Sequence, residues 1–304
     1  MTWFPAHDPI AGDAASVDAI ELVVVPRARD LGPFAVRRAL PHGRRQMVGP
    51  FIFFDHFGPV TFIAGQGMDI APHPHIGLST VTWLFDGTVT HRDSEQNIQT
   101  IRPGAMNLMT AGRGIAHSER TPDDARAAPH SILGLQSWIA LPEGLEEIDP
   151  SFQHFSAENL PVVADHGVAA RIIAGRAFGA ASPVRTLSDW FYVEVSFTAG
   201  RRVPLDADYE DRAVYLVDGE IEVGGDRFTG PRLLVFRPGD RLAIRTITDG
   251  RMMLLGGATL EGPRHIWWNF VSSRKERIEE AKEAWRLARF PAVPDETEVI
   301  PLPG

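Results

Sequence analysis

The chain has 304 residues, of which 44% are apolar and 23% charged, the composition of a globular protein with room for about two domains of ~150 residues. A formal net charge of −9 argues against a direct nucleic-acid partner, because nucleic-acid binders present a basic surface to phosphates. No stretch approaches the ~20 apolar residues that span a bilayer, and residues 1–9 lack the features of a secretion signal. The absence of cysteine fits a reducing compartment, so we expect a cytoplasmic protein with no membrane partner.

Short runs of β-branched and aromatic residues recur along the chain and predict an all-β fold. Glycine, proline and aspartate separate these runs at intervals of roughly 8–12 residues, a spacing typical of sandwiches and barrels. Four examples are Glu21–Val25, Phe51–Phe54, Thr80–Phe85 and Trp190–Phe197.

Two pairs of ligand-type residues stand out in the first half of the chain, His73 with His75 and His117 with Glu119. Side chains two residues apart on a strand point to the same face, so each pair can present both members to one site. If the two strands lie side by side or face each other across a barrel, three imidazoles and one carboxylate converge. Such donors suit one divalent iron, copper, nickel, manganese or zinc ion, whereas the lack of cysteine excludes a thiolate site.

The residues around both pairs resemble the two signatures of the cupin superfamily. Gly67 and Gly87 flank the first pair much as glycines do in the first cupin signature. Gly104 and Gly112 precede the second pair, with Thr110 in the place where proline is usual. The resemblance implies a cupin-type, jelly-roll β-barrel around the ligand pairs.

The carboxylate is placed differently from the usual cupin pattern. The usual glutamate position falls at Ser79 or Thr80, so a carboxylate would come from Glu119 on the other strand. With this relocation, the runs 69–87 and 110–119 resemble the pirin family of bicupins.

The resemblance to pirins extends over roughly residues 20–290 and implies a non-haem iron site. Its ligands would be His73, His75, His117 and Glu119. One departure concerns Ile76–Ser79, where pirins commonly have Arg-Gly-Phe-Glu, so the substrate of other family members does not transfer directly.

Other residues near the two pairs have two interpretations each. His91 is a candidate alternate ligand or a group behind the ligands, and we favour a surface or supporting position over direct ligation. His56 and Asp55 could line the pocket or be buried in the core with hydrogen bonds. Phe53 and Met109 could wall an apolar cavity, with core packing as the default.

Two similar half-chains are visible in the turn motifs. Trp83–Gly87 is echoed by Tyr215–Gly219, and Arg102–Gly104 by Arg237–Gly239, which indicates a duplication. The Asp-Gly end of the first motif predicts a hairpin turn in each copy.

We therefore expect two tandem cupin-type barrels with a C-terminal helix. Residues 1–140 would form the metal-binding barrel, 141–185 a linking region rich in proline, alanine and glycine, and 186–304 a second barrel with a degenerate site and the terminal helix.

The second copy lacks the ligand pairs. Asp206 and Asp208 fall where the first pair would recur, and we interpret them as a solvated loop. Carrying the spacing of the turn motifs over to the second pair gives Met252 and Leu254, neither of which suits a metal. The sequence thus predicts one metal per chain.

One clear helix is predicted near the C-terminus. Ser273 and Glu276 have the spacing of a capping box, and the run to Arg289 is rich in helix formers. An apolar stripe for packing on a barrel is formed by Ile278, Ala281 and Trp285. The segment from Pro291 onward is expected to be loosely held.

An open, cysteine-free set of three histidines and one glutamate differs from closed structural zinc sites and favours catalysis or ligand sensing. We expect a divalent transition metal, Fe²⁺ first, with Cu, Ni, Mn or Zn as alternatives. A chelating flavonol-like or enol substrate could take the open positions, with Glu119 leaving the metal to act as the catalytic base. The resemblance implies a dioxygenase of the quercetin 2,3-dioxygenase type. The alternative is a non-catalytic, iron-binding regulator of transcription or metabolic enzymes that acts through a protein partner.

Overall fold

The computed structural model describes residues 19–30, 34–239 and 241–303 and divides into two compact units. One unit, here called barrel N, is built around Ile52–Ala157 and includes described residues of Ala28–Arg38 and from Glu261 onward. The other, barrel C, is built around Glu158–Leu260 and includes Ala39–Phe51 and described residues up to Arg27.

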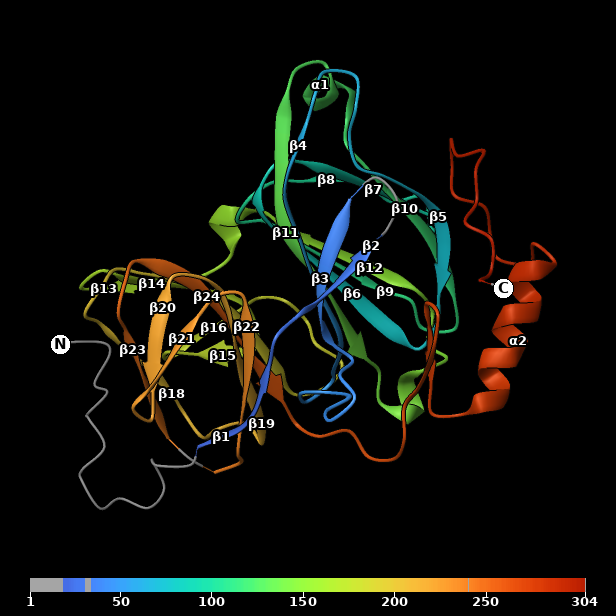
Figure 1. The fold of residues 1–304 in the computed structure, drawn as a ribbon. Helices are drawn as coiled ribbons and strands as arrows, with labels where there is room; N and C mark the ends of the chain where they lie inside the picture. The colour runs from blue at the N-terminus through green and yellow to red at the C-terminus, as the bar shows by residue number, and fades with distance from the viewer. Residues whose placement is uncertain (1–18, 31–33, 240, 304) are drawn as a thin grey trace. The chain divides into compact units, whose positions relative to one another are not determined.

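Barrel N contains two antiparallel sheets (Figure 1). The seven-stranded sheet has the order β12 (Ser151–Phe155), β9 (Met106–Thr110), β6 (Leu78–Asp86), β11 (His130–Ala140), β4 (Phe51–Phe62), β3 (Ala35–Leu40) and β2 (Arg27–Asp30). The four-stranded sheet has the order β5 (Asp69–His75), β10 (Ile115–Arg120), β7 (Val89–Asp93) and β8 (Ile98–Ile101). Apolar side chains from both sheets, including Phe57, Leu84 and Ile101, are packed together in the core.

Barrel C repeats this arrangement strand for strand. Its seven-stranded sheet has the order β1 (Ile20–Val24), β22 (Arg232–Phe236), β19 (Asp211–Asp218), β24 (Gly250–Gly257), β17 (Trp190–Phe197), β14 (Val168–Ala174) and β13 (Val162–Asp165). Its four-stranded sheet has the order β18 (Arg202–Leu205), β23 (Leu242–Thr246), β20 (Glu220–Val223) and β21 (Asp226–Thr229). The expected all-β fold of two cupin-type barrels is confirmed, and the first echoed motif ends β6 in one copy and β19 in the other. The second echo is wrong, because Arg102–Gly104 precedes β9 whereas Arg237–Gly239 follows β22, the strand that takes the place of β9.

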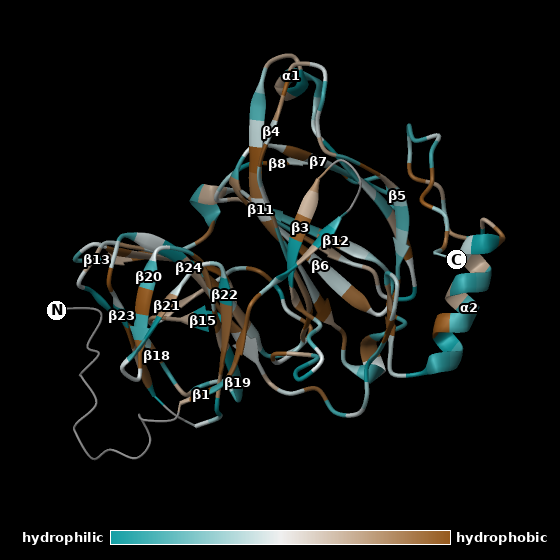
Figure 2. Ribbon diagram, in the orientation of Figure 1, coloured by the Kyte–Doolittle hydropathy of each residue, from teal (hydrophilic) through white to brown (hydrophobic). Residues whose placement is uncertain are grey.

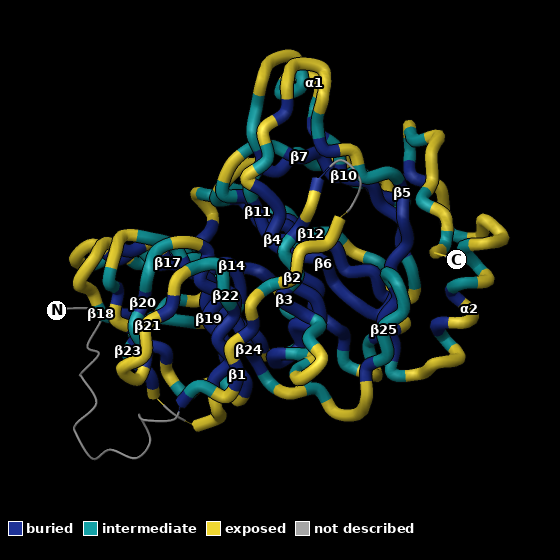
Figure 3. The backbone as a smooth tube through the Cα atoms, viewed as in Figure 1, coloured by how far each residue is buried: buried dark blue, intermediate teal, exposed yellow. Residues whose placement is uncertain are grey.

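Short elements complete the two units. They are α1 (Asp123–Arg126), the 3-10 turns Glu143–Leu145 and Ala157–Asn159, β15 (Arg176–Ala177), β16 (Ala180–Ala181), β25 (His265–Trp267), β26 (Phe270–Ser272) and helix α2 (Lys275–Arg286). The strands that face each other across the two sheets are largely buried, whereas the connecting loops are exposed (Figure 3). Within the described residues, neither helix has the length and apolarity needed to cross a bilayer.

The Asp-Gly motifs do not form hairpins. The strands β6 and β7 that flank Gly87 belong to different sheets, as do β19 and β20 around Gly219. Each glycine has a positive φ, +87° at Gly87 and +84° at Gly219, at the point where the chain crosses between sheets. A Cβ at Gly87 would lie 2.5 Å from the carbonyl oxygen of Ser131, so this crossing requires glycine for space as well as for conformation.

The division of the chain differs from the expected boundaries. The expected linking region 141–185 contains β12 of barrel N and β13 and β14 of barrel C. The terminal helix α2 belongs to barrel N, although its sequence follows barrel C. Local composition carries no information about which distant strand a segment pairs with. The turn residues therefore could not show that the expected linking region contributes strands to both barrels, or that α2 belongs to barrel N.

Helix α2 confirms the apolar stripe but not the capping box. Ile278 and Ala281 are buried with Ile76 and Phe270, and Trp285 packs against them, while the rest of the helix is mainly hydrophilic (Figure 2). The cap residue is Arg274, whose side chain makes no capping hydrogen bond.

The hydroxyl of Ser273 donates instead to the carboxylate of Glu146, at 3.1 Å. The same carboxylate accepts from the Ser273 amide at 2.8 Å and the Ser272 hydroxyl at 2.9 Å, and lies 3.4 Å from the Arg264 guanidinium. Glu146 and Arg264 are both buried. This network, rather than a capping box, fixes the chain as it enters α2.

We expect the substitution Glu146→Gln to lower the free energy of unfolding by about 3–5 kcal/mol, because it leaves the buried Arg264 charge without a carboxylate and with backbone carbonyls alone. Glu147→Gln is the matched control. Its carboxylate is half exposed and pairs with Arg277 at 2.7 Å, so the loss should be about 0–1 kcal/mol. Urea unfolding of both variants measures the difference, and equal losses would contradict this account.

Candidate metal centre

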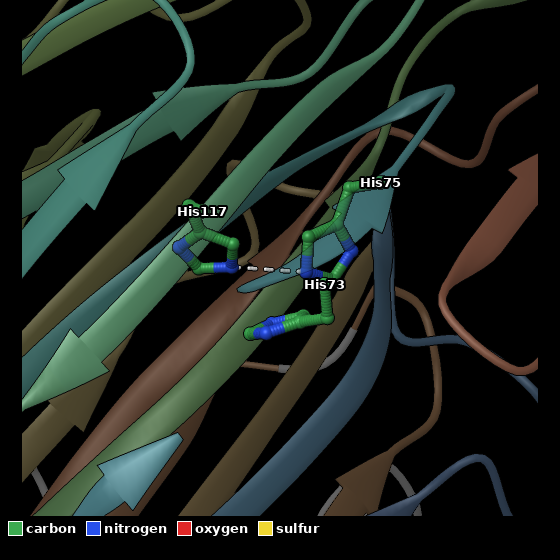
Figure 4. Close-up of side chains that lie close together, drawn as sticks. All are labelled: His73, His75 and His117. Carbon is green, nitrogen blue, oxygen red and sulfur yellow. Dashed lines mark hydrogen bonds between the residues drawn. The ribbon is translucent and has the colours of Figure 1, made fainter. Parts of the chain in front are cut away.

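The two ligand pairs lie on neighbouring antiparallel strands of barrel N. In the register of β5 and β10, His73 is directly opposite His117, and His75 is opposite Ile115. Since alternate residues of a strand share a face, His75 points to the same side as His73. Figure 4 shows the three imidazoles converging from these two strands.

The three histidines form a tight, buried cluster. One ring nitrogen from each can be chosen so that all three lie within 4.8 Å of one another, and Nε2 of His75 is 3.1 Å from Nε2 of His117. The exposed fractions of His73, His75 and His117 are 8%, 1% and 0%. Among the described residues, this is the group of side chains arranged to hold a metal ion.

Backbone carbonyls fix two of the rings. Nδ1 of His73 lies 3.0 Å from the carbonyl oxygen of Ala71, and Nδ1 of His75 lies 3.1 Å from that of Asn269. A carbonyl can only accept, so each Nδ1 carries the proton and each Nε2 presents a lone pair to the cluster. Asn269 was not suggested by the sequence, because its backbone rather than its side chain makes the contact.

His91 supports His117 from behind. Nδ1 of His117 lies 3.3 Å from Nδ1 of His91, and Nε2 of His91 lies 3.0 Å from the carboxylate of Asp93. Although burial acts to raise it, hydrogen bonds from His91 and Asn97 hold the pKa of Asp93 below its usual value. An ionised Asp93 accepts from His91 Nε2–H, which leaves His91 Nδ1 to accept from His117.

These tautomers make the cluster fit a cation. With protons on both Nδ1 atoms, the Nε2 lone pairs of His75 and His117 face each other across 3.1 Å. Two lone pairs at this distance repel, and a bound metal ion would turn the repulsion into two coordinate bonds. Nitrogen donors of this kind, each oriented by a second hydrogen bond, are typical of transition-metal sites.

Burial also keeps the imidazoles neutral. Desolvation lowers the pKa of His73 to about 4, even though its hydrogen bond to Ala71 acts in the opposite direction. Desolvation, followed by neighbouring imidazoles, sets the pKa values of His75 and His117 well below the usual 6.5. All three ligands are therefore ready to bind a metal at neutral pH without first releasing a proton.

Glu119 lies beside the histidines, and its carboxylate is engaged elsewhere. The pairing of β5 and β10 shifts between His117 and Glu119, where Glu119 is opposite Ile70. Oε1 of Glu119 accepts a hydrogen bond from Thr82 at 3.1 Å, and the carboxylate is outside the cluster defined by the three imidazoles. Burial raises the pKa of Glu119, against the opposing effects of His91 and Thr82.

A cavity of about 490 Å³ adjoins the cluster within barrel N. It is lined by His73, His75 and Glu119 together with a mainly aromatic and apolar wall, formed by Phe34, Val36, Phe53, Phe57, Met68, Ile70, Trp138, Trp268 and Ile300. Polar groups on the lining are Arg38, Asp55, Asp69, Thr82, Gln136 and Asn269. A cavity of this size matches pockets that hold small organic ligands.

Two charged groups and two aromatic rings form one side of this cavity. Phe53 and Trp138 are stacked, with ring centroids 3.9 Å apart and an interplanar angle of 12°. The Arg38 guanidinium lies 4.3 Å from the centroid of Phe53 and makes two 2.8 Å hydrogen bonds to Asp55. Burial raises the pKa of Asp55, which Arg38 partly offsets.

Of the four residues whose roles the sequence left open, two line this cavity and two do not. Phe53 and Asp55 line the cavity, whereas His56 and Met109 are buried away from its lining. Burial lowers the pKa of His56 to about 4, in keeping with a neutral core histidine.

The departure from the usual pirin sequence also lies away from the cavity. Ile76 packs against Phe270 and Ile278, and the Ser79 hydroxyl bonds Thr110 at 2.9 Å. Residues 76–79 are therefore not part of the described lining of the cavity.

The corresponding positions of barrel C are apolar. Strand β23 takes the place of β10, and its residue Ile244 is paired with Val203 of β18, both in the core. Met252 and Leu254 are also core residues, but they lie on β24, which corresponds to β11. The extrapolated positions are thus on the wrong strand, because the spacing comes from Arg102–Gly104 and Arg237–Gly239, two turns that lie at different places in the two barrels.

Comparisons with known proteins agree with this geometry. Residues 33–139 match the Pirin family, and residues 192–291 match the Pirin C-terminal cupin domain. The chain belongs to the pirin family. It is 46% identical over 289 residues to a pirin-like protein of Caulobacter vibrioides, covering 93% of this chain and 99% of that protein.

Two further pirin-family relatives carry an enzyme name. A Pseudomonas aeruginosa protein with the provisional name quercetin 2,3-dioxygenase is 39% identical over 272 residues, covering 88% of this chain and 84% of that protein. The crystal structure of a quercetin 2,3-dioxygenase from Acinetobacter baumannii has a TM-score of 0.86 and 36% identity, covering 93% of this chain and 95% of that one.

Each of the substitutions His73→Ala, His75→Ala and His117→Ala should abolish stoichiometric metal binding. Loss of a residue that hydrogen-bonds a metal ligand weakens metal affinity by roughly 10–100-fold, and loss of the ligand itself should weaken it by more. The control is His166→Asn, at an exposed position in barrel C. Elemental analysis after reconstitution and gel filtration checks this, and full metal content in a ligand variant would refute the assignment.

The metal-free protein should lose stability as the pH falls from about 6.5 to 4. In this window the unfolded chain binds protons on His73 that the folded chain does not, so the free energy of unfolding decreases with decreasing pH, by up to about 3 kcal/mol for this residue. Urea unfolding at several pH values should give a shallower dependence for His73→Gln than for the wild type. Identical slopes would show that His73 titrates normally.

Proposed function

We propose that this protein is a metal-dependent dioxygenase of the quercetin 2,3-dioxygenase type, acting on a flavonol-like or enol substrate that chelates the metal. The observation that carries the proposal is the opening of the three-histidine cluster onto a cavity of about 490 Å³ that Glu119 also lines. A structural metal site would be closed by its protein ligands, whereas this arrangement leaves one side of the site accessible.

The residues suited to hold the metal are His73, His75 and His117, with Glu119 as the fourth ligand. Glu119 is on the same strand as His117, so a change of its side-chain torsions away from Thr82 would bring the carboxylate toward the imidazoles. We infer one divalent ion, Fe²⁺ in the first place. When bound, the metal would supply Lewis-acid activation of a chelating hydroxyl and a place for O₂.

The chain itself would orient the substrate and move one proton. The stacked Phe53 and Trp138 give the cavity a rigid apolar wall against which an aromatic substrate can pack, and Arg38, which is ion-paired with Asp55, lies on the far face of Phe53. When its carboxylate is turned to Thr82 and away from the metal, burial raises the pKa of Glu119 and makes it a stronger base than an exposed glutamate. We infer that Glu119 accepts the proton of the substrate hydroxyl.

Oxygen uptake with a panel of flavonols tests the proposal. The protein would be loaded separately with iron, copper, nickel and manganese and its metal content measured. We expect metal-dependent uptake of O₂ with at least one chelating flavonol, and none with analogues in which the chelating hydroxyl is methylated. Tight metal binding without turnover across the panel would instead favour the regulatory protein that acts through protein contacts.

We expect Glu119→Gln to lower turnover by about 10²–10⁴-fold per bound metal, the range for loss of a general base. The variant keeps the size of the side chain and an oxygen donor but removes the charge and the basicity. Metal affinity should fall much less, because the three imidazoles remain. Glu95→Gln, at an exposed position on the same barrel, is the control, and an unchanged rate in Glu119→Gln would limit Glu119 to charge neutralisation.

A further inference from the structure

The segment after helix α2 is bound to the edge of the metal-site sheet. The amide of Ile300 donates to the carbonyl of Pro72 at 2.8 Å, and the indole of Trp285 donates to the carbonyl of Ile300 at 2.9 Å. Pro72 immediately precedes His73 on β5, the outermost strand of the sheet. The expectation of a loosely held tail is therefore wrong for this segment.

Ion pairs hold the same segment to strand β10. The Arg120 guanidinium makes hydrogen bonds of 2.8 and 2.6 Å to the two carboxylate oxygens of Glu296, and a third of 3.2 Å to Glu298. The Arg120 bonds, ahead of any effect of burial, keep the pKa of Glu296 below its usual value. Arg120 follows Glu119 directly, so the tail is anchored beside both pairs of proposed ligands.

Ile300 lines the metal cavity together with His73 and Glu119. Its neighbour Val299 does not line this cavity and is 65% exposed. On its other side the segment borders a second cavity, of about 930 Å³, whose lining includes Glu298, Val299 and Pro301. Within residues 296–301, Ile300 thus borders the metal cavity and the other five residues border the second cavity.

We propose that residues 296–301 form a selective wall of the metal site, and that Ile300 determines how large a chelating ligand can reach the metal. The inference rests on the proposed function, since it assumes that an organic ligand enters this cavity. It follows from three observations: the backbone bond next to His73, the two carboxylates on Arg120, and the one residue of the segment that lines the metal cavity. The inner strands of the two sheets cannot adapt in this way, because both of their edges are hydrogen-bonded to neighbouring strands.

The first test compares ligand sizes in the iron-loaded, full-length protein without oxygen, so that binding is measured without turnover. Catechol is the small probe and quercetin the large one, with calorimetry as the readout. Ile300→Trp should weaken quercetin binding by at least about tenfold, the order expected when a large side chain is forced into an occupied space, and change catechol binding less than about twofold. Val299→Trp is the matched control and should alter neither.

The second test measures access to the metal without any substrate. Ferrozine, a bulky iron chelator, should remove iron at least about tenfold faster from Ile300→Ala than from the wild type or Val299→Ala. Glu296→Ala, which removes two of the hydrogen bonds between the tail and Arg120, should also speed removal. Asp295→Asn should not, because it is exposed and asparagine tolerates the φ of 60° at this position.

The outcomes separate the two ideas. A protein that holds iron but gives the same size preference and extraction rate in Ile300 and Val299 variants would overturn the wall and leave the proposed function standing. A wild-type protein that binds neither catechol nor quercetin at the metal would overturn the proposed substrate class and the wall with it. Catechol and quercetin affinities that both fall equally in Ile300→Trp would also overturn size selection.

Discussion

The antiparallel pairing of β5 with β10 is the constraint on which the metal site depends. It places His73 directly across from His117 and, through the alternation of side chains, brings His75 to the same face. A shift of one residue in this register would turn one of the histidine pairs toward the other face. The sheets of barrel N therefore stabilise the site by fixing one register rather than by any single strong contact.

Burial has opposite consequences for the two kinds of ligand. It lowers the pKa of the imidazoles, which keeps their lone pairs free, and raises the pKa of Glu119, which makes its carboxylate a better base. The hydrogen bonds that His73 and His75 donate to the carbonyls of Ala71 and Asn269 orient these two rings, and the chain through His91 to Asp93 orients His117. In the metal-free barrel, the Nε2 lone pairs of His75 and His117 face and repel each other. The surrounding sheets hold the rings in this unfavourable arrangement.

The ligand pairs could be predicted from sequence because they depend on neighbours two residues apart. The duplication could be predicted from the Asp-Gly motifs that end at Gly87 and Gly219, and the apolar stripe of α2 from its helical spacing. Contacts between distant segments could not be predicted: the carbonyl of Asn269 on His75, Trp138 stacked on Phe53, and Ile300 at the cavity.

Local signals also failed where a tertiary contact competes, as at Ser273, whose hydroxyl donates to Glu146 rather than capping the helix.

The hydrogen bond between His75 and Asn269 spans 194 residues of chain and has a consequence for biosynthesis. At about 5–20 residues per second, a ribosome makes Asn269 roughly 10–40 s after His75. During that interval the imidazoles are present without the carbonyl that orients one of them, and without the segment that later lies against β5. A metal ion captured by the nascent chain would meet an incomplete site, so correct loading is expected only after residues 269–300 have left the ribosome.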